Sequence, residues 1–232
     1  MIRQILLTLA GSVILLAALV YFTEETPSPE LLVSDDVADL QGPLTREEQE
    51  SSKLENPINL HNMNPIAIIS TNYGVIELEL FADTMPVTAG NFTKLAEEGF
   101  YNGTKFHRVI SDFMVQGGDP NSKGTDESTY GTGSPGYTIQ DEHVAGEMLS
   151  NVKGTIAMAN SGPNTGGSQF FINLADNTYL DFDKEPLQSK HPVFGRVVSG
   201  MDVVEKIGVV ETKERDIPVE PIVVEKIEIV RP

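Results

Sequence analysis

The sequence predicts a mainly β domain, folded as an antiparallel sandwich or a closed barrel. Beyond residue 65 the chain contains many short apolar runs that alternate with polar residues or are rich in β-branched residues, and turn residues separate them. Only two segments there have the spacing of an amphipathic helix, and no internal repeat is present. Many short strands with few helices are typical of sandwiches and barrels.

Length and composition limit the classes of protein to which the chain can belong. With 232 residues, 40% of them apolar, it is long enough for one well-buried domain and additional segments. Its 16 basic and 34 acidic residues give a net charge of −18. This charge disfavours nucleic acid as a partner, because phosphate binding needs a basic surface. The absence of cysteine excludes disulfides, thiolate nucleophiles and cysteine-ligated metals.

The N-terminal segment predicts a membrane anchor. Residues 5–22 form an apolar run that, as a helix, would nearly span the hydrocarbon layer of a bilayer. The run ends at Phe22 without the small residues of a signal cleavage site, so we favour a signal anchor over a cleaved signal peptide. Arg3 places the N-terminus in the cytoplasm. We therefore expect a membrane-anchored protein whose folded domain lies outside the cytoplasm, with secretion after signal cleavage as the alternative.

Residues 23–63 predict a flexible acidic linker. They contain ten acidic residues, two basic residues and four prolines, and their apolar residues are sparse and lack a sustained period. Such a segment cannot bury enough apolar surface to offset the entropy lost on ordering. The expected organisation is a signal-anchor helix at 1–22, a linker at 23–63 and a folded domain at 64–232.

The folded domain shows strand and helix signals in turn. Residues 75–81 alternate apolar with acidic side chains, as a half-buried strand does. A helix follows, because Pro86 suits its first turn, four apolar residues share one face and Gly99 can end it. The second predicted helix covers residues 201–207. Further strands are predicted at 106–110, 113–116, 155–159, 169–174, 193–198 and 222–230.

Two common site patterns are present but lack their structural context. Gly131, Gly133 and Gly136 match the dinucleotide pattern G-x-G-x-x-G, yet no apolar strand precedes them and no amphipathic helix follows. The four histidines are scattered without the spacing of metal ligands. We therefore expect neither a dinucleotide site nor a metal site.

Two pairs of carboxylates also fail to predict a site. Asp141 and Glu142 are adjacent, and neighbours in an extended segment point to opposite faces, so a shared acid–base site is not expected. Asp181 and Asp183 lack the twelve-residue ligand pattern of a calcium loop, so a mobile surface loop is expected there.

Two longer stretches carry the functional signal. Residues 106–119 read FHRVISDFMVQGGD and place one guanidinium, Arg108, on a strand-like run. Residues 156–172 read IAMANSGPNTGGSQFFI, an irregular polar centre between strand-like flanks. Taken alone, Arg108 would be a solvated strand residue, and the second stretch would be a long polar hairpin loop.

Together with YLD at residues 179–181 and HPVFG at 191–195, these stretches resemble the cyclophilin family of peptidyl-prolyl cis/trans isomerases. The resemblance covers about residues 66–230, in the same order. It implies an eight-stranded antiparallel closed β-barrel capped by two α-helices, here preceded by the hydrophobic N-terminal helix. With that helix, the chain is similar to a bacterial-like, membrane-tethered member.

The resemblance also implies the site residues. The catalytic group would comprise Arg108, Gln116, Asn160 and His191. The substrate-binding residues would be Phe113, Met114, Ala159, Gln169, Phe171, Tyr179 and Leu180.

The implied activity is rotation about X-Pro bonds in peptides and folding proteins. Arg108 would donate a hydrogen bond to the imide nitrogen in the twisted state, and neither a metal nor a cofactor is implied. The expected partners are proline-containing polypeptides and, through the N-terminal helix, a membrane; nucleic acid is not a partner, and a monomer is expected. A binding module or chaperone that captures proline segments without essential turnover is the alternative, because one groove serves both.

The sequence departs from the family pattern in three places. Tyr179 stands where many members have a Trp that contributes to binding the cyclic peptide inhibitor cyclosporin. Isomerisation is therefore implied, whereas strong inhibition is not. Residues 121–130 and 182–190 resemble insertions near the implied groove that would alter substrate choice.

Overall fold

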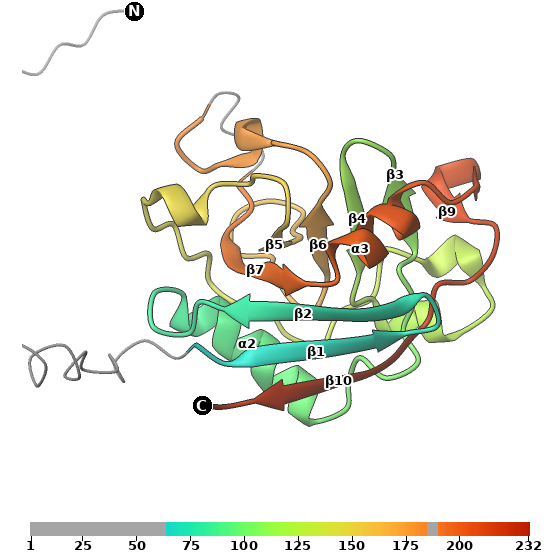
Figure 1. Cartoon of the computed structure of the whole chain (residues 1–232), viewed down its shortest axis with the longest axis horizontal. Helices are drawn as coiled ribbons and strands as arrows, with labels where there is room; N and C mark the ends of the chain where they lie inside the picture. Colours follow the sequence, from blue (N-terminus) through green and yellow to red (C-terminus); the bar gives the residue numbers. More distant parts are fainter. Residues whose placement is uncertain (1–63, 185–189) are drawn as a thin grey trace, which may run out of the picture. The chain divides into compact units, whose positions relative to one another are not determined.

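The computed structural model describes residues 64–184 and 190–232. The predicted anchor and linker lie outside these residues, and no helix within them is long and apolar enough to cross a membrane. Eight strands form one antiparallel sheet in the order β10-β1-β2-β7-β5-β6-β4-β3, and β8 and β9 form a separate hairpin (Figure 1). The strands are β1 (Ile66–Thr71), β2 (Gly74–Leu80), β3 (Arg108–Ile110), β4 (Met114–Gly117), β5 (Thr155–Met158), β6 (Phe170–Asn173), β7 (Val193–Ser199), β8 (Thr212–Lys213), β9 (Ile217–Pro218) and β10 (Val224–Val230).

The eight-stranded sheet curls into a half-barrel whose end strands, β3 and β10, are not joined by a ladder in the part of the chain that the structure describes. The main chain closes part of this gap just before both strands. Lys105 and Val223 form an isolated antiparallel bridge, and the Phe106 amide donates to the Ile222 carbonyl at 2.9 Å. The predicted mainly β fold, strand number and antiparallel pairing are confirmed, whereas full closure of the barrel is not.

Helix α2 (Pro86–Glu97) begins and ends where the sequence predicts. Pro86 occupies its first turn, and Gly99 follows its end with a left-handed φ of 70°. A distant carboxylate caps its N-terminus: Glu142 accepts from the Val87 amide at 2.9 Å and from the Thr88 amide at 2.6 Å. The loop that carries Glu142 is thereby fixed to the helix.

Helix α3 (Met201–Gly208) also matches its prediction, with one additional residue at its end. It begins directly after Gly200, whose φ of 82° only glycine adopts readily. A Cβ at this position would lie 2.2 Å from the Val75 carbonyl oxygen, so the close approach of β2 also requires glycine. In Figure 1, α3 lies beside β2 and β4, and α2 lies behind β1 and packs against β10.

Aromatic rings fill the core on the inner face of the sheet. Phe170 of β6 packs edge-on against Phe92 of α2, with ring centroids 5.4 Å apart, and against Tyr101 at 5.7 Å. Phe106 and Phe194 complete the cluster. All five rings are buried, and their edge-to-face contacts stabilise the core beyond the burial of area alone.

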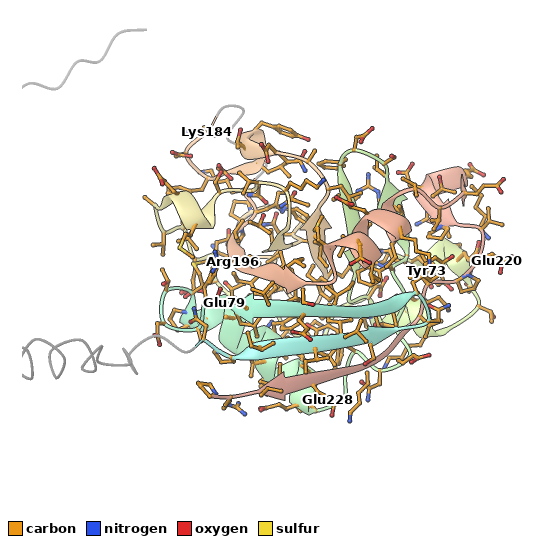
Figure 2. The ribbon with its side chains drawn as sticks, in the orientation of Figure 1. Tyr73, Glu79, Lys184, Arg196, Glu220 and Glu228 are labelled. Atoms are coloured by element: carbon orange, nitrogen blue, oxygen red, sulfur yellow. The ribbon has the colours of Figure 1, made fainter. Side chains whose placement is uncertain are left out.

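The outer face of the sheet differs from one part to another. On β2 and β7 it carries charged side chains, and Glu79 and Arg196, directly paired across the two strands, form an ion pair at 2.8 Å (Figure 2). On β3, β4 and β6 the register instead aligns Arg108, Gln116 and Phe171 in one row. Residues paired directly across antiparallel strands share a face, so this row lies on the side of the sheet opposite Phe170.

Candidate active site

Arg108 and Gln116 form the polar half of the row. The Arg108 Nη1 lies 3.5 Å from Gln116 Oε1, at the outer limit of a hydrogen bond, and Gln116 Nε2 donates to Gln169 Oε1 at 3.0 Å. Gln169 Nε2 in turn donates to the carbonyl oxygens of Gly133 at 2.8 Å and Gly131 at 3.1 Å. Because those carbonyls can only accept, they fix both amide orientations, so that an oxygen of Gln116 faces the guanidinium.

The apolar half lies beside this polar row. Met114, Phe171 and Leu180 are buried members of the core cluster, and the partly buried Phe113 packs against that cluster. Tyr179 stacks on Phe113 with the two ring planes 18° apart and the centroids separated by 6.5 Å. The Tyr179 side chain is 49% exposed, so it forms an outer edge of the site rather than its floor.

His191 lies against the apolar half. Its ring meets the Phe171 ring edge-on at 5.3 Å, and its Nδ1 lies 3.1 Å from the Met158 carbonyl oxygen. The carbonyl requires a proton on Nδ1, so the neutral ring has Nε2 as its acceptor. Burial lowers the pKa of His191, and the Met158 carbonyl and the charge of Asp141 oppose that shift. The ring is therefore neutral at physiological pH.

A buried carboxylate, that of Asp181, is connected to the main chain of His191 through Asn151. Asp181 accepts from the Asn151 amide at 2.7 Å and from its Nδ2 at 2.9 Å, and Asn151 Nδ2 also donates to the His191 carbonyl at 3.0 Å. Asp181 is only 8% exposed. The prediction of a mobile surface loop is therefore wrong at Asp181, because its hydrogen bonds fix the chain on both sides of the site.

A groove continues from Gln116 toward the loop after β5. Asn160 borders it, and the Asn160 side chain donates to the Lys190 carbonyl at 2.7 Å and so ties the loop to residue 190. The Ala159 amide donates to the Gln169 carbonyl at 3.0 Å. The groove has a volume of about 420 Å³ and is lined by Gln116, residues 131–134, 159–161, Thr165 and 167–169.

All eleven sequence-predicted residues thus lie on or beside one surface of β3, β4 and β6 and the loops around it. Two neighbours of Arg108 were not predicted. The first is Asp216, whose Oδ2 accepts from Arg108 Nε at 3.3 Å. The second is His107, which is 3% exposed and whose ring nitrogens have no hydrogen-bond partner among the described residues. Local pattern carries no signal for Asp216, because 108 residues separate it from its partner.

Comparison with known proteins gives consistent matches. The family model described as cyclophilin type peptidyl-prolyl cis-trans isomerase/CLD matches residues 66–229. Peptidyl-prolyl cis-trans isomerase-like 1 of Mus musculus is 44% identical over 162 residues, which cover 68% of this chain and 88% of that protein. The Homo sapiens protein of that name is 43% identical with the same coverage. A crystal structure of a cyclophilin type isomerase from Cryptosporidium parvum superposes with a TM-score of 0.62 and 29% identity, over 73% of this chain and 98% of that one.

These relatives correct the expectations drawn from the N-terminal sequence. They come from eukaryotes, so a bacterial-like character is not supported. Because the match covers 88% of the mouse and human proteins, too little of either remains for a counterpart of residues 1–63. This finding overturns the predicted membrane-anchored location outside the cytoplasm, since the proteins that this chain matches have no room for the anchor and linker on which it rested.

The fold, the row of site residues and the comparisons agree over the whole described domain. The family match begins at the first residue of β1 and ends one residue before the end of β10, and the two mammalian relatives are 43–44% identical to this chain over 162 residues. The activity that the sequence implied is that of these relatives. The chain belongs to the cyclophilin-type peptidyl-prolyl cis-trans isomerases.

Proposed function

We propose that this isomerase accelerates rotation about X-Pro bonds through Arg108, which donates a hydrogen bond to the imide nitrogen of the bound proline. The barrier to rotation is about 18–20 kcal/mol, because rotation breaks amide resonance. In the twisted state the nitrogen becomes pyramidal and regains a lone pair that a guanidinium can bind. The planar ground state lacks this acceptor, so the interaction stabilises the transition state selectively.

The observation that carries the proposal is the row of Arg108, Gln116 and Phe171 across three strands. It places a charged donor beside an apolar wall on a sheet rather than on a loop. A proline ring against that wall would present its nitrogen toward the donor. A guanidinium is always charged in proteins, so no proton transfer is needed.

The hydrogen bond supplies only part of the acceleration. A charge-assisted hydrogen bond contributes about 1.5–3 kcal/mol net, whereas a ten-thousandfold acceleration needs about 5.4 kcal/mol. We assign the remainder to holding the substrate in the twisted geometry. Phe113, Met114, Phe171 and Leu180 would bind the proline ring, with His191 at the rim.

Polar groups would hold the adjoining peptide. We assign this role to the Gln116 side chain and the Asn160 main chain, and the engagement of the Asn160 side chain by Lys190 supports that assignment. Ala159, Gln169 and Tyr179 would complete the walls. A Cryptosporidium parvum relative of 29% identity was crystallised in the presence of the dipeptide Ala-Pro. We therefore propose proline-containing polypeptides as substrates of the domain at residues 64–232.

Arg108→Ala tests the proposal in a protease-coupled proline isomerisation assay. We expect kcat/KM to fall roughly 10- to 100-fold, the range that one charge-assisted hydrogen bond provides. Arg196→Ala is the matched control, because it removes a guanidinium that is about half exposed and ion-paired on another part of the sheet. The control should retain the wild-type rate.

The alternative is a module that binds proline segments without essential turnover, because the apolar wall alone could capture such a segment. Peptide affinity, measured by calorimetry on the same variants, separates the two. Loss of turnover with retained affinity in Arg108→Ala supports catalysis by Arg108. Equal rates in wild type and Arg108→Ala would refute the proposed role.

A further inference from the structure

The β8–β9 hairpin lies beside Arg108 and contributes the second partner of its guanidinium. Arg108 Nε donates to Asp216 Oδ2 at 3.3 Å, and Nη1 points to Gln116 Oε1 at 3.5 Å. The two contacts hold different nitrogens of one planar group. A planar guanidinium held at two nitrogens has its plane fixed, whereas one contact would leave it free to rotate.

The hairpin presents Asp216 through an unusual backbone. Arg215 and Asp216 have φ values of 67° and 60°, so two consecutive residues other than glycine are left-handed. This conformation is uncommon and persists only where the surrounding structure holds it. The turn therefore needs contacts from outside the hairpin.

Those contacts come from the segment that resembled an insertion. Arg215 Nη1 donates to the Glu127 carbonyl at 2.9 Å, and its Nη2 donates to the Tyr130 carbonyl at 2.8 Å. Lys213 Nζ pairs with the Glu127 carboxylate at 2.8 Å. The hairpin is thus docked onto residues 127–130 by two side chains.

The same segment also holds the opposite side of Arg108. Tyr130 is followed by Gly131, whose carbonyl accepts from Gln169 and so fixes the orientation of Gln116. Hydrogen bonds and short pieces of main chain together form a closed ring, which runs from Arg108 through Gln116 and Gln169 to residues 130–131 and returns through Arg215 to Asp216. Both partners of the guanidinium therefore depend on one segment.

We propose that Asp216 is a positioning residue that orients Arg108 for catalysis, and that its docked hairpin serves this purpose. The inference rests on the proposed role of Arg108. The side chains of Arg108 and Asp216 are 42% and 44% exposed, and ion pairs with such exposure contribute little to the stability of the fold. The effect should therefore appear in turnover rather than in folding.

Asp216→Ala and Asp216→Asn test this role in the full chain. Two-dimensional NMR exchange spectroscopy on an Ala-Pro-containing peptide gives kcat and KM separately. We expect Asp216→Ala to lower kcat roughly two- to fivefold with KM unchanged, the fold-change that corresponds to a half-exposed ion pair. Asp216→Asn should recover much of the loss, because its amide oxygen can still accept from Arg108 Nε.

A control variant separates positioning from the loss of a surface charge. Glu228→Ala removes a carboxylate of similar exposure, paired with Lys226 on β10, the far end strand of the sheet (Figure 2). It should leave kcat unchanged, and both Asp216→Asn and the control should keep the wild-type unfolding transition in urea, because asparagine also tolerates the left-handed φ at position 216. A kcat for Asp216→Ala equal to or above that of wild type would overturn the inference.

The double variant Arg108→Ala/Asp216→Ala distinguishes the two proposals. If Asp216 acts through Arg108, removing Asp216 should cost nothing further once Arg108 is absent. An equal additional loss in that background would overturn the positioning role while leaving Arg108 as the donor. If Arg108→Ala alone keeps full turnover, the proposed function itself fails.

Discussion

Phe170 and Phe171 are neighbours on β6, yet Phe170 contacts the rings of the core whereas Phe171 meets His191 at the site. The alternation of a strand puts them on opposite faces. The inner face is completed by nearby apolar residues of the same sheet and by α2. The outer face is completed by loops and a hairpin from distant parts of the chain. Phe170 thus belongs to the core alone, whereas Phe171 is a buried member of the core cluster that also lies at the site.

Substituting alanine for Phe170 or for Phe171 tests this difference between the two rings and should give the largest effects. Phe170→Ala should lower the free energy of unfolding by about 3–5 kcal/mol, because it empties a fully buried position packed against three other rings. Phe171→Ala should lower the stability less, since the Phe171 ring lies at the edge of the core against His191, but it should lower the turnover per folded molecule more. Urea denaturation and the isomerisation assay measure the two quantities. Equal losses of stability and turnover in both variants would contradict this difference.

The pH dependence of the free energy of unfolding tests whether the two buried histidines are neutral in the folded state. The expected change is smaller than that for Phe170→Ala. Burial lowers the pKa of His107, helped by the charges of Arg108 and Arg215 and opposed by Asp119, and burial also lowers the pKa of His191. The unfolded chain therefore binds protons near its usual pKa of about 6.5 while the folded chain does not. The folded state should lose stability as pH falls below about 6.5, by at most about 1.36 kcal/mol per pH unit for each histidine.

The variant His107→Phe measures how much of this loss of stability per pH unit is due to His107. The phenyl ring keeps the shape and the contact with the Tyr130 ring, and neither nitrogen that it replaces has a hydrogen-bond partner among the described residues. Unfolding in urea at pH 5.5 and pH 7.5 should show a smaller difference for the variant than for wild type. An unchanged difference would mean that His107 takes up its proton in the folded state as well.

Tyr179→Trp tests the exposed rim and should have the smallest effect on folding. Tyr179 is about half exposed, so the free energy of unfolding should change by less than about 0.5 kcal/mol. Turnover should stay the same. Cyclosporin should inhibit the variant more strongly, because the indole adds an N–H donor where many family members have one. An inhibition constant equal to that of wild type would show that the substitution at 179 does not limit inhibitor binding.

Local signals predicted the elements that local contacts determine. Pro86 and Gly99 bounded α2 correctly, and the longer strands were found within one or two residues of their observed ends. Asp141 and Glu142 diverge as expected, since Asp141 bonds to Asn164 whereas Glu142 caps α2. The two-residue strands β8 and β9 were missed, because two residues show no period. The strand β1 was also missed, since the sequence indicated only where the domain begins.

The site residues likewise divide into those that the sequence predicted and those that it did not. The side chains of the site were identified through the motifs that resemble the cyclophilin family, and the structure brings them to one surface. The groups that orient them were not predictable. Two are backbone carbonyls of Gly131 and Gly133, which leave no trace in a sequence, and the third is Asp216, which depends on how a distant hairpin docks. The sequence therefore identifies the side chains of the site, but the contacts that orient these side chains are known only from the folded structure.

The pairing of β1 with β10 has a consequence for synthesis of the protein. Ile66 at the start of β1 is paired with Val230, the last residue of β10. At about 5–20 residues per second, a ribosome needs on the order of ten seconds to add the residues between them. During that time β1 lacks the strand that covers one of its edges, and open edges invite pairing with other chains. A nascent chain that stops before Val224 therefore leaves this edge of β1 unpaired, even though all eleven predicted site residues have already been made.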